Sequence, residues 1–229
     1  TIGGLQDNMV VACGKHFPGH GDTATDSHKE LPVVDAGLQR LRDTEFPPFQ
    51  QAIRYGVASL MTAHVLYRAL DPEAPATLSS AVIQRLLREE FRYEGVVFTD
   101  DLEMHAIIDH DGIGEAAVRS FVAGCDVLLI CKDQDRVMTA MQAMERAVKD
   151  GRVTQERLDQ SLARVAKLKA RYLHPYKPVT ISDARLVVGC RSHKVLLDSW
   201  HKAYARIPKP TLVERGQAAP AHDSPVTHV

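Results

Sequence analysis

The 229-residue sequence has no long apolar stretch, and no run approaches the ~20 residues that a helix needs to cross a bilayer. Its N-terminus, TIGGLQDNMV, lacks the pattern of a secretory signal peptide. An excess of either charge is also absent, because 28 Lys and Arg residues stand against 29 Asp and Glu residues. The sequence therefore indicates no nucleic-acid or membrane partner.

Cysteine is scarce, and its four copies are scattered at positions 13, 125, 131 and 190 with no CxxC pair. In a chain of this length, such a distribution is typical of reduced cysteines, so we expect a cytoplasmic protein. The chain starts at Thr1 rather than at a methionine, and we expect a further segment upstream of it. The remaining composition, 45% hydrophobic and 25% charged, is that of an ordinary globular protein.

Short apolar runs alternate with longer segments of helical periodicity. The runs cover residues 9–13, 57–65, 95–99 and 125–131, and each is continuous, as in parallel strands buried on both faces. Helices are predicted over residues 44–56, 81–93, 115–123, 136–150 and 155–173, mostly bounded by Ser, Thr or Gly. This alternation predicts four βα units, which could form a small doubly wound sheet or half of an eight-stranded barrel. An unrelated α+β arrangement is the alternative.

The composition changes after His174, where prolines become frequent. One further helix is predicted over residues 183–205. Residues beyond 207 have little apolar surface to bury, so we expect them to be disordered. The predicted organisation is therefore an α/β unit over residues 1–175, a helical extension over 176–206 and a disordered tail over 207–229.

Ionisable residues gather at the ends of three successive predicted strands. Lys15 and His16 follow the first strand, His64 the second, and Asp100 and Asp101 the third. Because the carboxyl ends of parallel strands converge, these side chains should outline one pocket. A strand-end aspartate often caps the next helix, and that structural role is the expected one for Asp101.

The loop over residues 15–32, KHFPGHGDTATDSHKELP, is unusually rich in titratable groups. A zinc pair at His16 and His20 would need a helix, which Pro18 and Gly19 prevent. A phosphate-binding loop is also poorly matched, because the lysine does not stand in the P-loop order before a helix. These two kinds of site are therefore disfavoured.

Acid–base and nucleophilic chemistry is the third possibility for this loop. Asp100 would supply a rigid carboxylate, and His28 a proton donor whose reference pKa of ~6.5 lets it give and take a proton. Asp26, two residues earlier, could orient the imidazole. From spacing alone, a solvated loop with no catalytic role remains open for Asp26 and His28.

The motif KHFPGHGDTATDSHKELP, followed by GVVFTDDLEM, resembles the bacterial β-N-acetylglucosaminidases of glycoside hydrolase family 3, which serve peptidoglycan recycling. MTAHV and GCDVLLIC fit the same family in the same order, and the resemblance covers about residues 1–175. It implies a (β/α)8 barrel, of which this chain would hold about the last four βα units, followed by a helical tail. Residues 1–175 would then be the C-terminal part of the catalytic barrel.

The resemblance also implies roles for individual residues. Asp100 matches the nucleophile, His28 the general acid/base and Asp26 its partner, whereas Lys15 and His16 match residues that bind sugar hydroxyls. The implied reaction is retaining hydrolysis of the β-1,4 bond between N-acetylglucosamine and anhydro-N-acetylmuramic acid. It implies no metal or organic cofactor and a saccharide as the small-molecule partner. The sequence does not reveal the oligomeric state, and we expect a monomer.

Two other functions remain open at this point. The chain could be a truncated, non-catalytic fragment that keeps the sugar-binding loop, because its sugar contacts would be incomplete. It could also belong to a β-N-acetylglucosaminide phosphorylase, because a histidine acid/base tolerates an anionic phosphate acceptor better than a carboxylate does.

Overall fold

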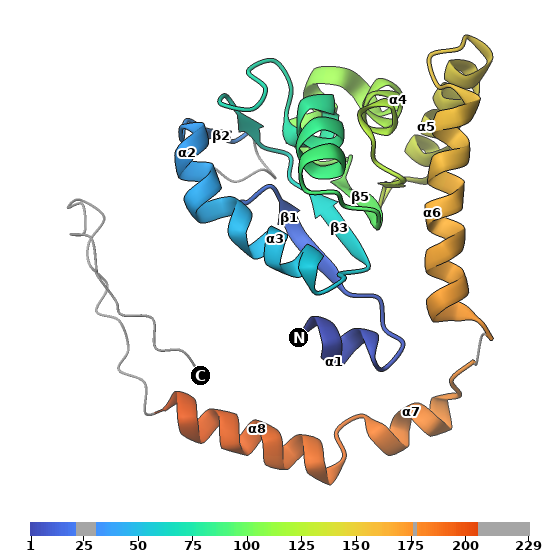
Figure 1. Cartoon of the computed structure of the whole chain (residues 1–229). Coiled ribbons are helices and arrows are strands. Elements are labelled where there is room, and N and C mark those ends of the chain that lie inside the picture. Colours follow the sequence, from blue (N-terminus) through green and yellow to red (C-terminus); the bar gives the residue numbers. More distant parts are fainter. Residues whose placement is uncertain (22–30, 176–177, 206–229) are drawn as a thin grey trace. The chain divides into compact units, whose positions relative to one another are not determined.

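A computed structural model describes residues 1–21, 31–175 and 178–205, apart from the side chain of residue 110 (Figure 1). The chain divides into two compact units, residues 1–176 and 177–229, and each is described here by itself. Within the described ranges, no helix is both long and apolar enough to span a membrane.

The first unit alternates strands and helical segments along the chain. The strands are β1 (Cys13–Phe17), β2 (Val33–Val34), β3 (Ser59–Thr62), β4 (Leu66–Tyr67), β5 (Val96–Asp101) and β6 (Val127–Leu129). The α-helices are α1 (Ile2–Gln6), α2 (Leu38–Arg40), α3 (Phe46–Arg54), α4 (His105–Ala123), α5 (Gln134–Lys149) and α6 (Gln155–Leu173). Two π-helical segments, η1 (Leu41–Glu45) and η3 (Ala81–Glu90), and a 3-10 turn, η2 (Ala76–Leu78), complete it.

A four-stranded parallel sheet, in the order β1-β3-β5-β6, forms the centre of this unit. Ser59 of β3 pairs with Cys13 on one side and with Val96 on the other. The strand order follows the chain order without a reversal, as in a barrel and unlike a doubly wound sheet. The α/β prediction with a barrel-type parallel sheet is therefore confirmed.

The first strand lies later in the sequence than predicted. We expected a strand over residues 9–13, but the ladder begins at Cys13 and runs through Lys15 and His16 to Phe17. Met9 has a positive φ of 61°, and Val10 is half exposed, so the start of the apolar run lies outside the ladder. Only Ala12, directly before Cys13, contacts the sheet, because its backbone oxygen accepts a hydrogen bond from the N–H of Ser59 at 3.1 Å. Lys15 and His16 are therefore part of the strand rather than residues that follow it.

An aromatic cluster packs α3 against the sheet. Phe17 of β1 contacts Phe49 of α3 edge-on, with ring centroids 5.2 Å apart, and Phe46 contacts Phe91 at 5.5 Å. Phe17 and Phe46 are fully buried. Burying each side chain contributes about 1.5–3 kcal/mol, so these rings hold β1 in place. The helix predicted over 44–56 is present, but its start was predicted wrongly: helical backbone begins at Leu38 and continues through η1 into α3, so Pro47 lies within it.

Asp126, immediately before β6, joins the sheet to α6. Its fully buried carboxylate accepts hydrogen bonds from the backbone N–H of Val97 at 3.0 Å and the hydroxyl of Ser161 at 2.7 Å. It also pairs with Arg88 at 2.7 Å and with Arg164 at 3.1 Å. One carboxylate therefore connects β5, β6, η3 and α6.

The other helical predictions differ from the structure mainly at their ends. Thr154 caps α6 as expected, because its side chain accepts a hydrogen bond from the N–H of Arg157. The helix predicted from residue 115 begins instead at His105, and Gly112, with φ 68°, interrupts its helical geometry.

The second unit contains α7 (Ile181–Val187) and α8 (Arg191–Tyr204). The single helix predicted over 183–205 is therefore wrong, because Gly189, with φ 69°, separates two shorter helices. The tail predicted to be disordered lies outside the described residues.

Candidate active site

The carboxyl ends of β1 and β5 bring two of the predicted site residues, His16 and Asp100, together. Asp100, near the end of β5, has a carboxylate oxygen 3.4 Å from Nε2 of His16 on β1. Its other oxygen accepts a hydrogen bond from the N–H of Asp101 at 2.8 Å. The two side chains are about one quarter exposed, at 24% for Asp100 and 27% for His16. The carboxylate is thus oriented by its own backbone while one oxygen faces the imidazole.

His16 lies in an environment that favours the neutral imidazole. Burial lowers the pKa of His16 below its usual value of 6.5, and the positive charge of Lys15 lowers the pKa further. The carboxylate of Asp100 opposes both effects without reversing them. At pH 7 His16 is therefore mainly neutral, and its nitrogens can donate and accept hydrogen bonds. Lys15 is exposed on the same strand.

His64 lies behind the two aspartates rather than beside them. It is 1% exposed, and its Nε2 is 3.0 Å from the backbone oxygen of Asp101, which can only accept a hydrogen bond. Nε2 therefore carries a hydrogen. Burial lowers the pKa of His64, which favours the neutral ring. Its Nδ1 lies 2.7 Å from the hydroxyl oxygen of Thr77, and that hydroxyl donates to the backbone oxygen of Ala63 at 3.0 Å. We infer that His64 positions the end of β5 through the Asp101 backbone and does not contact a substrate.

We expected Asp101 to cap the next helix, but it does not. Its carboxylate accepts a hydrogen bond from the N–H of Glu103 at 3.1 Å, which closes a turn directly after β5. Helix α4 begins two residues later, with Met104 at its N-cap and no side-chain cap. The prediction was wrong because the strand needs a turn before the helix can begin.

The start of the loop after β1 depends on one glycine. Gly19 has a φ of +143°, and a Cβ added there would lie 2.8 Å from Cβ of Glu45. Its backbone oxygen accepts a hydrogen bond from the buried hydroxyl of Tyr67. A side chain at position 19 would therefore be strained both by its backbone conformation and by its neighbour.

Two predicted catalytic residues, Asp26 and His28, lie outside the described residues. Their placement relative to Asp100 therefore stays a prediction. His20, at the described end of the same loop, has its ring centroid 5.8 Å from that of His16. Among the described residues, no group of three or more His, Cys, Asp or Glu side chains is arranged to hold a metal ion.

Glu103 is an organising residue that the sequence analysis missed. Its side chain is 5% exposed and accepts hydrogen bonds from the backbone N–H groups of Cys131, Lys132 and Asp133, at 2.9, 2.6 and 3.2 Å. Arg136 donates a further bond at 3.4 Å. Glu103 therefore joins the turn after β5 to the loop after β6. Its only sequence signal is its place three residues after Asp100.

Comparison with known proteins gives a family match over residues 1–168, described as the glycosyl hydrolase family 3 N-terminal domain. A β-hexosaminidase of Nitrosomonas eutropha is 36% identical over 170 residues, which cover 73% of this chain and 49% of that protein. A family 3 β-N-acetylglucosaminidase structure from Paenibacillus sp. str. FPU-7 matches with a TM-score of 0.82 and 42% identity, over 86% of this chain and 38% of that one.

A third structure, the β-glucoside phosphorylase BglX bound to 2FGlc, matches with a TM-score of 0.74 and 27% identity, over 81% of this chain and 35% of that one. This chain therefore spans about half the length, or less, of the relatives it matches. The β1-β3-β5-β6 sheet is part of a TIM-barrel-type domain. On the match over residues 1–168 of its 229, the chain belongs to glycosyl hydrolase family 3.

Proposed function

We propose that this chain is part of a retaining β-N-acetylhexosaminidase that removes terminal β-linked N-acetylglucosamine. The observation that carries the proposal is the carboxylate of Asp100, fixed at the carboxyl end of a barrel-type strand and 3.4 Å from His16. A retaining glycosidase needs one carboxylate held beneath the anomeric carbon. Membership of a glycosidase family supports the same role.

In the proposed reaction, Asp100 attacks the anomeric carbon and forms a covalent glycosyl-enzyme. His28 protonates the departing glycosidic oxygen and then removes a proton from the water that hydrolyses the intermediate. Asp26 orients the imidazole of His28 and stabilises its charged form. Because two displacements occur at the same carbon, the β configuration is retained.

Lys15 and His16 are proposed to bind the hydroxyl groups of the sugar. His16 is suited to this because a neutral imidazole both donates and accepts, and its Nε2 lies beside the attacking carboxylate. The exposed ammonium of Lys15 can donate up to three hydrogen bonds to hydroxyl oxygens. Together they would orient the sugar ring over Asp100.

The proposed natural substrate is a muropeptide in which N-acetylglucosamine is β-1,4-linked to anhydro-N-acetylmuramic acid. The motif KHFPGHGDTATDSHKELP, typical of peptidoglycan-recycling enzymes, supports this choice. A cytoplasmic location is proposed with it, and the free state of all four cysteines is compatible with a reducing compartment. Cell fractionation followed by immunoblotting would check the location.

The assay is release of 4-nitrophenol from its β-N-acetylglucosaminide by the full natural protein that contains these residues. Asp100→Ala should nearly abolish turnover, whereas Asp150→Asn, at an exposed position after α5, should leave it unchanged. His28→Ala should lose about 10²–10⁴-fold, the usual contribution of a general acid/base. Wild-type rates in the Asp100→Ala protein would refute the assignment.

Product chemistry separates the roles of the two residues. Added azide should restore turnover in the His28→Ala protein and yield the β-glycosyl azide, because azide attacks the glycosyl-enzyme from the face opposite Asp100. Peptide mapping after trapping with a fluorinated slow substrate should place the sugar on Asp100. An α-configured product from the wild-type protein would contradict retention.

Two alternatives are tested by the same protein. Structural similarity to a β-glucoside phosphorylase favours testing phosphorolysis, in which inorganic phosphate accelerates turnover and sugar-1-phosphate accumulates. A non-catalytic sugar-binding role for the isolated 229 residues predicts binding of N-acetylglucosamine without turnover. Turnover by these residues alone would exclude that role.

A further inference from the structure

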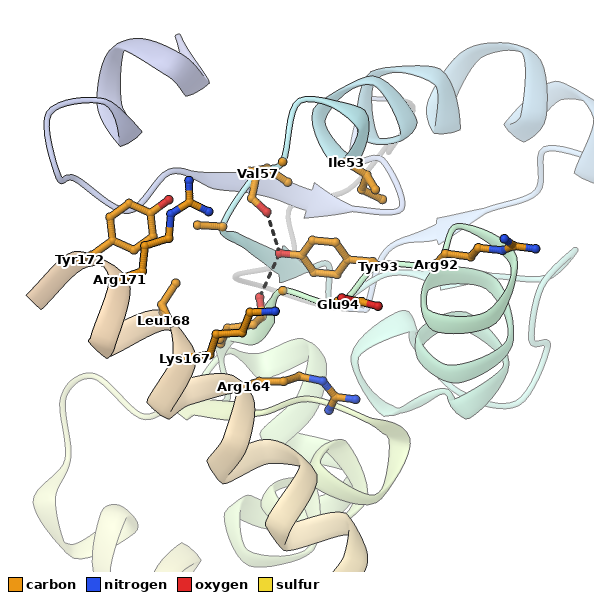
Figure 2. Close-up of a pocket in the computed structure, with 14 residues that line it drawn as sticks. Ile53, Val57, Arg92, Tyr93, Glu94, Arg164, Lys167, Leu168, Arg171 and Tyr172 are labelled. Carbon is orange, nitrogen blue, oxygen red and sulfur yellow. Dashed lines mark hydrogen bonds between the residues drawn. The ribbon is translucent and has the colours of Figure 1, made fainter.

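A cavity of about 320 Å³ lies at the amino ends of β3 and β5, the opposite end of the sheet from Asp100 (Figure 2). Val57 and Ala58, directly before β3, and Gly95, directly before β5, form one side. Residues of α6 form the other. The proposed reaction uses none of these groups, so the cavity is separate from the candidate active site.

One wall of the cavity is apolar. Ile53, Val57 and Leu168 line it, together with the ring of Tyr93. The hydroxyl of Tyr93 has acceptors of its own, the backbone oxygens of Val57 at 3.3 Å and Val96 at 3.4 Å, as Figure 2 shows. This wall therefore offers apolar contact surface and leaves no hydrogen-bonding requirement unmet at Tyr93.

Tyr172, near the end of α6, is different because its hydroxyl is unsatisfied. The side chain is 5% exposed, and within the described part of the chain its hydroxyl has no hydrogen-bond partner. Leaving a buried polar group unpaired costs about 1–3 kcal/mol. The residue lines the cavity, so an acceptor placed there would satisfy it (Figure 2).

Positive charge borders the same cavity. Arg92, Lys167 and Arg171 line it and have no acidic partner among the described residues, whereas Arg164 is already paired with Asp126. Arg171 places its guanidinium 5.1 Å from the ring centroid of Tyr172. One acidic residue, Glu94, is also present. The lining therefore carries an excess of positive charge beside an unpaired buried hydroxyl.

We propose that this cavity binds a small organic anion with an aromatic or alicyclic body and a phosphate or carboxylate head. The body packs against Val57, Leu168 and the ring of Tyr93. The head accepts a hydrogen bond from the Tyr172 hydroxyl and is neutralised by Lys167 and Arg171. Such a ligand contacts both the apolar wall and the positively charged border of the cavity. Inorganic phosphate would contact only the charged border, and a neutral hydrocarbon only the apolar wall.

The test uses the full natural protein that contains these residues and isothermal titration calorimetry with 1-naphthyl phosphate, 1-naphthoate, inorganic phosphate and 2-naphthol. We expect one equivalent of 1-naphthyl phosphate or 1-naphthoate to bind, and the stronger of the two identifies the head group. Inorganic phosphate and 2-naphthol should each bind at least about tenfold more weakly, because each lacks one half of the interaction. Excess N-acetylglucosamine should not compete.

Tyr172→Phe is the decisive variant, because it removes only the unpaired hydroxyl. Its thermal stability should be unchanged or higher, whereas affinity for the preferred naphthyl probe should fall about tenfold, the value of one hydrogen bond to a charged group. Lys167→Met combined with Arg171→Met should cause a similar loss, and Lys149→Met, on the exposed surface of α5, should cause none. Absence of naphthyl binding, unchanged affinity in Tyr172→Phe, or competition by N-acetylglucosamine would overturn the proposal.

Discussion

Replacing Asp126 with asparagine would remove one buried negative charge and almost no volume. The carboxylate contacts three guanidinium groups, those of Arg88 at 2.7 Å, Arg164 at 3.1 Å and Arg157 at 3.6 Å. The side chains of Arg88 and Arg157 are 8% and 11% exposed, so neither can turn freely into water. The substitution therefore leaves buried positive charge without a counter-ion.

The expected loss of stability follows from which contacts survive. Arg88 keeps hydrogen bonds to the backbone oxygens of Tyr93 and Gly95, whereas Arg164, 25% exposed, can turn to solvent. The uncompensated charge on Arg88, and to a lesser extent on Arg157, therefore dominates. Breaking a buried ion pair by removing one partner typically costs about 3–5 kcal/mol, and we expect Asp126→Asn to fall in this range.

Urea unfolding at pH 7, followed by circular dichroism, would measure the change. Glu115→Gln is the matched control, because it makes the same carboxylate-to-amide change in the exposed pair with Arg152, and should leave the midpoint unchanged. Added salt should not restore the Asp126→Asn protein, since the charges are buried. A loss below about 1 kcal/mol would refute the view that Asp126 holds α6 to the sheet.

Three further predictions concern residues near the strand ends and the cysteines. Gly19→Ala should lower the free energy of unfolding, measured by urea titration, by about 1–3 kcal/mol. Gly37→Ala is the control, because an added Cβ there meets open space, and it should cause no such loss. Equal losses in the two variants would show that the contact with Glu45 is not the cause. Burial lowers the pKa of His64 below the unfolded value of 6.5, so unfolding binds a proton at lower pH. The contribution of neutral His64 to the free energy of unfolding is complete above about pH 6.5 and is lost as the pH falls, by up to about 1.4 kcal/mol per pH unit. His64→Gln should therefore make the melting temperature depend less on pH between pH 7 and 5. A hydrogen bond from the Ser192 hydroxyl to the sulfur lowers the pKa of Cys190, whereas partial desolvation and the carboxylate of Asp101 raise the pKa of the exposed Cys131. Iodoacetamide at pH 7.5 should therefore modify Cys190 before Cys131, as mass spectrometry would show, and the reverse order would contradict these pKa directions.

The fold could be predicted from the sequence because apolar runs and helix ends are local signals. Thr154 predicted the start of α6 correctly, since a cap depends on groups only a few residues away. The start of β1 was predicted wrongly because Met9 and Val10 are apolar but pair with no strand in the described part of the chain. Pairing with β3 decides where β1 begins, and that contact spans more than forty residues of sequence.

The candidate site could be predicted only in part for the same reason. Asp100 and His16 stand out as ionisable residues on neighbouring strands, and their 3.4 Å approach follows from the parallel sheet. The position of His64 depends on its hydrogen bond to the backbone oxygen of Asp101, and the spacing of residues along the sequence does not reveal that bond. Glu103 was missed because its partners are backbone groups almost thirty residues later.

The hydrogen bonds accepted by Glu103 limit how the substrate specificity of this domain can be redesigned. Three successive backbone N–H groups after β6 depend on a carboxylate that follows Asp100 by three residues. A change in the length of either loop would therefore alter the position of the other loop, and with it the position of the Asp100 carboxylate. Specificity is better varied by exchanging side chains within this frame than by inserting or deleting residues around it.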